Sequence, residues 1–422
     1  GIPGVYFRKS TLRSYPSGKL AAHVLGQVDM DNKGLAGLEK SLDARLSAGE
    51  DITLSIDAGV QAVVAREIAR QMEVFEAIGG AGVMLDIHSG EVVAMVSLPD
   101  YNPNHFAAIE DDARFNRATL GLYEMGSTFK VLNTAIALES GATTTSSYYE
   151  VSKPLRFGRF SVWDYHMYDR DLSVPEILVL SSNIGSARMA ADIGAERQQF
   201  YLRQLGLFDK VSLEIPEMAN PLVPGTWRST SIATVSYGHG ISVTPLHLAS
   251  SVAAASGSGA IVEPTLMHRG GAPAPMSERL FSEETTKAVR SMMRLVVSHP
   301  DGTGNFAEAK GYMVGGKTGT SEKINPDGGY FKDKNIASFA ATFPVHDPRY
   351  VLVVMVDEPK GQKHSYGYAT GGWVAAPAAK RIIEHAAPLL GILPVDENSP
   401  EIRQKLRLDF KIGKEEKTLA SY

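Results

Sequence analysis

The sequence contains no cysteine. This absence excludes disulfide bonds, thiol nucleophiles and thiolate metal sites. The sequence also has little excess charge, because 42 lysine and arginine residues stand against 47 aspartate and glutamate residues, for a formal net charge of −5. Such a balance lacks the basic field that attracts nucleic acid. We therefore expect no nucleic-acid partner.

Long apolar runs and metal-binding motifs are missing as well. No run approaches the roughly 18 apolar residues that span a bilayer. The first residue is Gly1 rather than a methionine. We therefore expect a piece of a longer protein, whose membrane anchor or export signal would precede this sequence. The histidines are scattered and no His-Glu-x-x-His sequence occurs, so we expect no metal site.

The 422 residues are enough for two or three domains. Apolar, β-branched runs gather before residue 100 and after residue 310, and helical periodicity dominates between them. This order predicts an α+β fold, in which an antiparallel sheet built from both chain ends carries a helical subdomain. We predict a short strand over residues 51–56, hairpins over 82–98 and 336–356, a loop over 211–230, and helices over 59–76, 127–139, 282–297 and 375–390.

Composition divides the chain into three regions. Residues 1–50 are Gly-rich with a basic start, and we interpret them as the end of a preceding domain and a linker. Residues 51–395 hold the predicted sheet and helices and form the main domain. Residues 396–422 are charged, and we expect a solvated or partly disordered tail.

Residues 123–130, Tyr-Glu-Met-Gly-Ser-Thr-Phe-Lys, form the segment around which the chain is organised. Gly126 permits a sharp entry into the predicted helix. Ser127 and Lys130 are three residues apart, so they lie on the same face of that helix. A hydroxyl beside an amine and a helix N-terminus is typical of a nucleophilic serine. By itself the spacing also fits a capping serine beside a solvated lysine.

A second motif, Ser181-x-Asn183, follows at a predicted turn between helices. If burial and a cationic neighbour keep Lys130 neutral, its amine can accept the proton of Ser127. Ser181 can then relay protons. Asn183 can hold Lys130 and donate to a substrate amide.

A third motif, Lys317-Thr318-Gly319-Thr320, lies on a predicted strand. Lys317 would supply positive charge, and the hydroxyls of Thr318 and Thr320 suit an anionic substrate end. Gly319 would leave the strand surface open to a peptide backbone. The backbone N–H groups of Ser127 and Thr320 are candidates for an oxyanion hole. Together the three motifs supply the parts of acyl transfer.

These motifs in this order resemble those of penicillin-binding serine acyltransferases and serine β-lactamases. The flanking sequence is similar to class B penicillin-binding proteins over about residues 51–390. Residues 24–48 resemble the end of the family's non-catalytic pedestal, and the division-specific member more than the elongation-specific one. Met125 departs from the pattern because the family usually has proline there, which predicts a looser helix entry. The matching segments are Asn116-Arg117, 123–130, 181–185, Tyr237-Gly238, 243–246 and 315–320.

The resemblance implies a D,D-transpeptidase of cell-wall synthesis. Ser127 would attack a D-Ala-D-Ala stem peptide of peptidoglycan, expel the terminal D-alanine, and pass the acyl group to the amine of a second stem. β-Lactam antibiotics would acylate the same serine. No cofactor would be needed. The implied setting is septal synthesis at the periplasmic face of the bacterial inner membrane, with a division or glycosyltransferase protein as partner and an upstream anchor in the membrane.

A nucleotide-binding interpretation must also be considered, because Gly311-x-x-x-x-Gly316-Lys317-Thr318 matches the Walker A pattern. A phosphate-binding loop needs a strand before it and a helix after it. Residues 305–310 are not β-branched, and Gly319 with Pro326 disfavours a following helix. The sequence context therefore argues against this class.

Hydrolysis is a closer alternative. A β-lactamase needs a base that activates water, and Glu214 and Glu217 follow the second motif, although a surface loop is the simpler interpretation of that Pro-rich stretch. A non-catalytic β-lactam sensor would share the fold. Residues 163–166 could border the cleft or pack as an aromatic cluster. Tyr366, Thr370 and Gly371 could form a mobile loop beside it.

Overall fold

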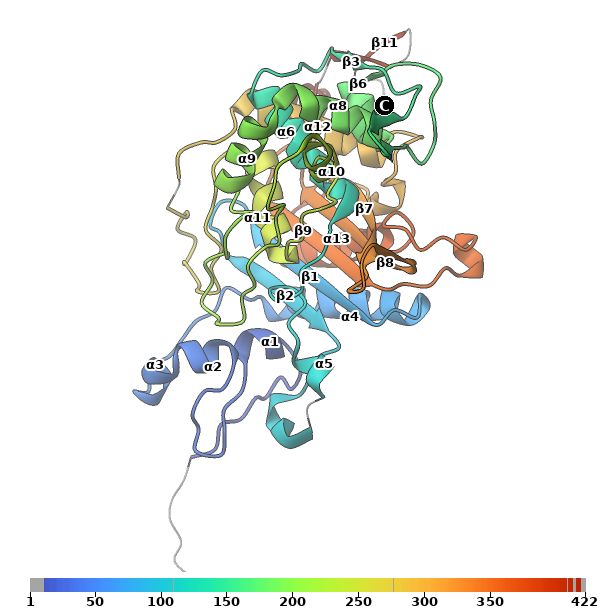
Figure 1. Cartoon of the computed structure of the whole chain (residues 1–422). Helices are drawn as coiled ribbons and strands as arrows, with labels where there is room; N and C mark the ends of the chain where they lie inside the picture. Colours follow the sequence, from blue (N-terminus) through green and yellow to red (C-terminus); the bar gives the residue numbers. More distant parts are fainter. Residues whose placement is uncertain (1–10, 109, 276, 408, 413–414, 419–422) are drawn as a thin grey trace, which may run out of the picture.

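The computed structural model describes residues 11–108, 110–275, 277–407, 409–412 and 415–418. At its centre is an antiparallel sheet with the strand order β2-β1-β9-β8-β7 (Figure 1). Both ends of the chain contribute to this sheet, as the sequence predicts, and the α+β fold class is confirmed. Its strands are β1 (Gly79–Asp86), β2 (Val92–Leu98), β7 (Gly315–Ile324), β8 (Tyr330–Phe343) and β9 (Tyr350–Asp357).

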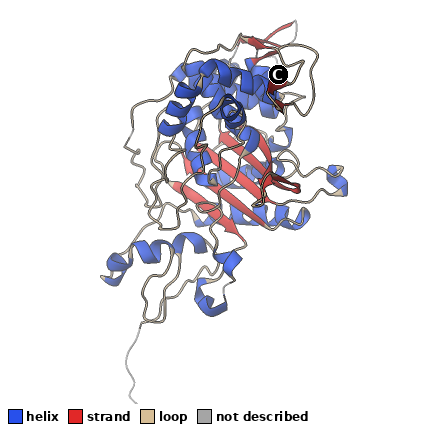
Figure 2. Cartoon of the chain, in the orientation of Figure 1, coloured by secondary structure: helices blue, strands red, loops and turns tan. Residues whose placement is uncertain are grey.

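Helices cover both faces of the sheet (Figure 2). Every residue of β1, β2 and β9 is buried, which explains why these strands read as continuous apolar runs. One face packs against α4 (Ala58–Val74) and α13 (Ala375–Leu389), and the other packs against α11 (Pro245–Ser256) and α12 (Glu283–Ser298). A side chain at Gly82 would meet Ile68 and Val64 of α4 at 2.6 Å, so this glycine lets the helix approach closely.

The helical subdomain surrounds α6 (Phe129–Glu139), which is buried along most of its length. Helix α7 (Val174–Val179) begins with a capping box between Ser173 and Glu176. No helix in the described part of the chain is long and apolar enough to cross a bilayer. The other helices of the subdomain are α8 (Asn183–Ile193), α9 (Ala195–Gln204) and α10 (Ser229–Val235).

Short elements complete the chain. The N-terminal helices lie together below the sheet in the view of Figure 1. The N-terminal helices are α1 (Ala22–Leu25), α2 (Gly37–Ser41) and α3 (Asp43–Ser47), followed later by α5 (Asp111–Arg114). Short strands pair as β3 (Tyr148–Tyr149) with β6 (Leu172–Ser173), and β4 (Leu155–Phe157) with β5 (Phe160–Val162). The 3₁₀ turns are η1 (Pro103–Ala108), η2 (Gly126–Thr128), η3 (Asn305–Ala307) and η4 (Lys363–Ser365).

The predicted strand over residues 51–56 is wrong, because only one bridge, Leu54 to Met267, forms there. The free edge of β2 is occupied instead by the start of α4. Gln61 donates to Met95 O and accepts from Met95 N, each at 2.8 Å. The predicted loop over residues 211–230 is correct except at its end, where α10 begins.

The expectation of a solvated tail is only partly correct over residues 396–407, where most residues are exposed but two are buried. Helix α14 (Pro400–Lys405) buries Ile402 and, just beyond its end, Leu406. These residues are four positions apart and form one apolar face on a charged segment. Glu397 adds a 2.6 Å hydrogen bond from Gly311 N. The backbone then forms a hairpin of β10 (Asp409–Ile412) and β11 (Glu415–Thr418). Residues 408, 413–414 and 419–422 of the predicted tail lie outside the described part.

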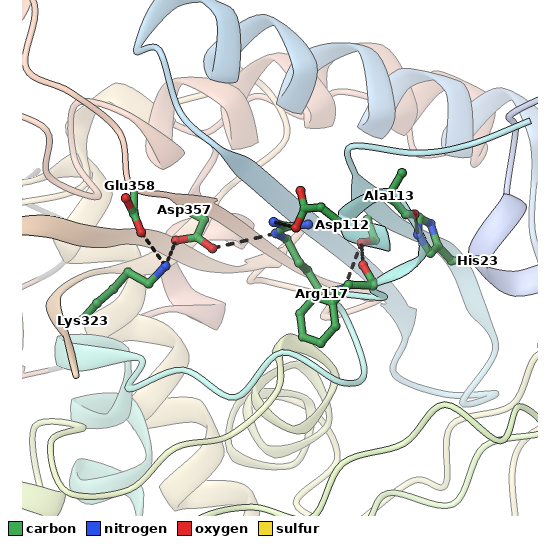
Figure 3. Close-up of polar contacts among 9 residues, drawn as sticks. His23, Asp112, Ala113, Arg117, Lys323, Asp357 and Glu358 are labelled. Carbon is green, nitrogen blue, oxygen red and sulfur yellow. Dashed lines mark hydrogen bonds and ion pairs between the residues drawn. The ribbon is translucent and has the colours of Figure 1, made fainter. Parts of the chain in front are cut away.

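Ion pairs around Arg117 join the segment before the first motif to the end of β9 and to β7 (Figure 3). The guanidinium of Arg117 pairs with Asp112 at 2.9 Å and with the carboxylate of Asp357 at 3.8 Å. Asp357 in turn binds Lys323 of β7 at 2.8 Å. Arg117 is buried, so this network stabilises the sheet only while its charges remain paired. Figure 3 also shows Glu358, which pairs with Lys323 at 2.8 Å, and a separate 2.8 Å contact between His23 Nε2 and the Ala113 carbonyl.

Candidate active site

Ser127 lies in η2, immediately before α6, and is half-buried. The predicted helix over residues 127–139 is confirmed, although its first turn is 3₁₀. Gly126 has φ 55°, and a side chain there would lie 2.7 Å from Thr320 O. Glycine is therefore needed both for the backbone conformation and for the close approach of β7. The Met125 carbonyl accepts a 2.9 Å bond from the hydroxyl of Thr128, which ties the entry to the helix.

Lys130 is fully buried and directed at the serine. Its Nζ lies 2.9 Å from Ser127 Oγ, 3.1 Å from Ser181 Oγ and 2.7 Å from Asn183 Oδ1. It also donates to the Ser181 carbonyl at 2.6 Å. Burial lowers the pKa of Lys130 to about 7, against the opposing influence of the Asp164 carboxylate. An amine with this pKa is partly neutral near neutral pH and can accept the proton of Ser127.

The second motif occupies the turn between α7 and α8, where Ser181 has φ 61°. The buried carboxylate of Asp164 holds this turn. It accepts from Ser182 Oγ at 2.6 Å, from Ile184 N at 2.9 Å and from the backbone N–H of Asn183. Asp164 therefore positions both Ser181 and Asn183. The sequence leaves open whether residues 163–166 border the cleft or pack as an aromatic cluster, and it gives no sign of this anchoring role.

Lys317 reaches the same turn from β7 and is fully buried. Its Nζ donates to Ser181 Oγ at 3.0 Å and to Thr303 Oγ1 at 3.4 Å. Thr318 Oγ1 donates to the same Thr303 oxygen at 2.9 Å. Burial, with a smaller contribution from the charge of Lys130, lowers the pKa of Lys317 well below its usual range. The charge expected of Lys317 is therefore disfavoured until an anion lies beside it.

Gly319 and Thr320 complete the third motif. A side chain at Gly319 would lie 2.3 Å from Ser338 Oγ and 2.4 Å from Met125 O. This glycine is thus required by packing behind the strand, whereas the sequence suggested an open strand surface. Thr320 Oγ1 accepts a 3.0 Å hydrogen bond from Gly371 N.

A cavity of about 640 Å³ opens beside Ser127. All three motifs contribute to its wall, through Ser127, Ser181 with Asn183, and Thr318 with Thr320. The structure therefore brings together every predicted site residue at or directly behind one cavity. Its other lining residues are Tyr165, His166, Leu180, Gly302, Thr303, Asn305, Phe306, Tyr368, Thr370, Gly372 and Trp373.

Two segments whose role the sequence left open contribute to the wall of this cavity. Of residues 163–166, Tyr165 and His166 line it, and their rings pack edge-on with 4.8 Å between centroids. Thr370 lines it from the segment after β9, and Tyr366 packs edge-on against Trp373 with 5.9 Å between ring centroids. Thr303 was not predicted from the sequence. The only available signal was the Gly-rich stretch around it.

Comparisons with known proteins agree with this geometry. The penicillin binding protein transpeptidase domain family matches residues 80–384. The chain is 41% identical over 403 residues to a probable peptidoglycan D,D-transpeptidase FtsI of Caulobacter vibrioides, with 93% of the chain and 68% of that protein covered. It is 32% identical over 421 residues to the peptidoglycan D,D-transpeptidase FtsI of Escherichia coli, with 93% and 70% covered.

The fold is similar to a crystal structure of penicillin-binding protein 3 from Mycobacterium tuberculosis complexed with aztreonam. The TM-score is 0.82 at 28% identity, and the match covers 91% of this chain and 92% of that chain. The chain belongs to the penicillin-binding protein transpeptidase family. The expected resemblance to the division-specific class B members is confirmed, and so is the enzyme class, D,D-transpeptidase.

The alternative interpretations do not fit the site of this family member. Lys317 lies inside β7, and the next element is another strand rather than a phosphate-binding helix. Glu214 accepts from Leu266 N at 2.8 Å, and Glu217 accepts from Gly37 N at 3.2 Å. Neither glutamate lines the cavity, and among the described residues its wall contains no carboxylate. The base that a β-lactamase needs for rapid deacylation is therefore missing from this wall.

The described residues contain no group of three or more His, Asp or Glu side chains that could hold a metal ion.

Proposed function

We propose that Ser127 is the nucleophile of a peptidoglycan D,D-transpeptidase and that Lys130 is its base. The 2.9 Å contact between Lys130 Nζ and Ser127 Oγ suits direct proton transfer. Ser127 Oγ attacks the carbonyl carbon of a D-Ala-D-Ala donor. The peptide bond breaks, and the terminal D-alanine leaves with a proton on its amine. The product is an ester between the stem peptide and Ser127.

We propose that Ser181 carries protons between the two lysines. Its Oγ lies within hydrogen-bond distance of both amines, at 3.1 Å from Lys130 and 3.0 Å from Lys317. A donor carboxylate near Lys317, Thr318 and Thr320 raises the pKa of Lys317 and favours its protonated form. The new charge disfavours a proton on nearby Lys130. Donor binding thus helps to deprotonate the base.

The backbone N–H groups of Ser127 and Thr320 form the proposed oxyanion hole. The amine of a second stem peptide then attacks the ester, regenerates the Ser127 hydroxyl and forms the cross-linking amide. Asn183 orients the donor peptide, and its Oδ1 holds Lys130 at 2.7 Å. A β-lactam follows the first half of this path. The aztreonam complex of the M. tuberculosis relative supports such binding.

The observation that carries this proposal is the meeting of the first two motifs around Lys130, with Lys317 of the third motif joined to them through Ser181 Oγ. Four oxygen atoms from residues 127, 181 and 183 surround its Nζ within 3.1 Å. A solvated lysine beside a capping serine, which the sequence left open, would not be fully buried.

The cellular setting and domain division are also proposals. We assign septal cell-wall synthesis to this enzyme, supported by its similarity to FtsI proteins. A division or glycosyltransferase partner and a membrane anchor upstream would place it at the periplasmic face of the inner membrane. Residues 1–50 would be the end of the pedestal and residues 51–395 the catalytic domain.

A test uses a synthetic stem peptide ending in D-Ala-D-Ala, with and without an amine acceptor. Mass spectrometry should detect released D-alanine and, with the acceptor, the new amide. The Ser127→Ala variant should yield neither. Release of D-alanine without amide formation at saturating acceptor would identify a carboxypeptidase instead. No turnover by the unmodified protein, despite a β-lactam adduct, would identify a sensor.

A further inference from the structure

Glu124 is a buried carboxylate behind the nucleophile, and the residues that line the cavity do not include it. The residue is 5% exposed. One oxygen, Oε1, accepts from Gly240 N at 2.7 Å and from the Tyr330 hydroxyl at 3.0 Å. The other oxygen, Oε2, is buried without a hydrogen-bond partner among the described residues. Burying such a group is unfavourable, so it requires an explanation.

The first donor to Glu124 belongs to the turn of residues 237–240, which packs directly on Gly126. A side chain at Gly238 would lie 2.2 Å from Gly126 O. Gly126 N donates to Gly238 O at 3.3 Å. Beyond the turn, Tyr123 and Val243 exchange two backbone hydrogen bonds of 3.0 and 2.9 Å. Movement of this turn would therefore displace Gly126 and, with it, Ser127.

The second donor, Tyr330, opens β8, the strand that pairs with β7 along the third motif. The backbone of Glu124 also contacts β7, because its carbonyl accepts from Ser321 Oγ. Glu124 thus joins three segments next to the two proposed oxyanion donors. These segments are residues 123–127, the turn 237–240 and the β7–β8 hairpin.

We propose that Glu124 is a positioning residue for acylation, which holds Ser127 against β7 so that the N–H groups of Ser127 and Thr320 aim at one point. Glu124 does not touch the substrate. Its two accepted hydrogen bonds set the spacing between the nucleophile segment and the strand. The inference rests on the proposed function, because it assumes that Ser127 is acylated.

The contacts favour an effect of side-chain length, here called reach, over an effect of the Glu124 charge. Both bonds end on one oxygen, which a neutral amide would retain. Burial raises the pKa of Glu124, and a negative charge here would disfavour a nearby oxyanion. The titratable groups facing it are Tyr237 and His239 from the turn and Tyr330 from β8. The pH dependence of the acylation rate constant must therefore be compared between variants.

Two variants separate reach from charge. Glu124→Gln keeps the reach and removes the charge, whereas Glu124→Asp keeps the charge and is too short to bridge both donors. Stopped-flow acylation by a fluorescent penicillin gives the binding constant and the acylation rate constant separately. The rate constant should fall roughly 10- to 100-fold in Glu124→Asp, with little change in binding, and by less than about threefold in Glu124→Gln. Thermal melts report folding of each variant.

Tyr330→Phe removes one of the two donors and keeps the ring, so it decides the matter if Glu124→Asp does not fold. It should slow acylation about two- to fivefold, and less so in combination with Glu124→Asp. Unchanged rates in Glu124→Asp, or in Tyr330→Phe if the former cannot be purified, would overturn the proposal. So would a fast Glu124→Asp with a slow Glu124→Gln, which would assign the effect to charge. Failure of the unmodified protein to acylate Ser127 would instead refute the proposed function.

Discussion

Lys130 and Lys317 meet at a single hydroxyl. Ser181 Oγ lies 3.1 Å from one amine and 3.0 Å from the other, and both lysine side chains are fully buried. Two buried ammonium groups so close together disfavour each other's charge. The proposed mechanism requires that Lys130 be neutral when Ser127 attacks.

Acylation should rise with pH through the pKa of Lys130. That pKa is lowered to about 7, so the neutral base accumulates as pH increases past this value and then reaches a plateau. The second-order rate of labelling by a penicillin, measured between about pH 5 and 9, tests this dependence. A rate that is flat across the range, in protein shown to remain folded, would contradict a titrating base.

The same shift predicts a pH-dependent stability. Lys130 has a folded pKa of about 7 against its usual 10.5, so the unfolded chain binds more protons between these values. The free energy of unfolding should therefore rise with pH in that window, by up to about 1.4 kcal/mol per pH unit per lysine. Denaturant titrations of the unmodified protein and of Lys130→Met compare the slopes. If the free energy of unfolding has the same pH slope in both proteins, the pH dependence arises from a group other than Lys130.

Asp164→Asn should weaken the second motif. An amide cannot accept all three hydrogen bonds that the carboxylate receives from residues 182–184. We expect a loss of about 1–3 kcal/mol in the free energy of unfolding and roughly tenfold slower acylation. Because the Asp164 charge raises the pKa of Lys130, the pH profile should also move to lower pH. Asp169→Asn, an exposed residue, is the matched control.

Gly126→Ala should lower the free energy of unfolding by more than its positive φ alone explains. Gly126 and Gly141 both have positive φ, 55° and 68°, but a side chain at Gly141 would meet nothing within 4 Å. Gly141→Ala should lose about 1 kcal/mol and keep full labelling. At Gly126 the contact with Thr320 O adds to this loss and should abolish labelling. Equal effects of the two substitutions would exclude the close approach of β7.

The three motifs and both hairpins could be predicted from sequence because their signals are local. Ser127 and Lys130 are one helical turn apart, and each hairpin consists of two apolar runs joined by a short turn. The contacts that complete the site are not local. Asp164, Thr303 and Glu124 act on residues from other elements, and nothing in their own neighbourhoods indicates those partners.

Other differences between prediction and structure arise from contacts that the sequence does not reveal. Residues 51–56 have β-like composition, but Gln61 already satisfies the edge of β2. The charged tail was expected to be solvated because two apolar residues, Ile402 and Leu406, are a weak signal in so polar a segment. Gly319 was assigned to the substrate side, whereas its tight contacts with Met125 O and Ser338 lie behind the strand.

Mass spectrometry of the protein after incubation with a penicillin tests the central claim most directly. The account predicts a stable adduct of one penicillin, located on the peptide that contains Ser127 and absent in Ser127→Ala. Lys130→Ala should slow its formation by roughly a thousandfold or more. An adduct on any other residue, or full labelling of Ser127→Ala, would contradict the assignment of Ser127 as the nucleophile.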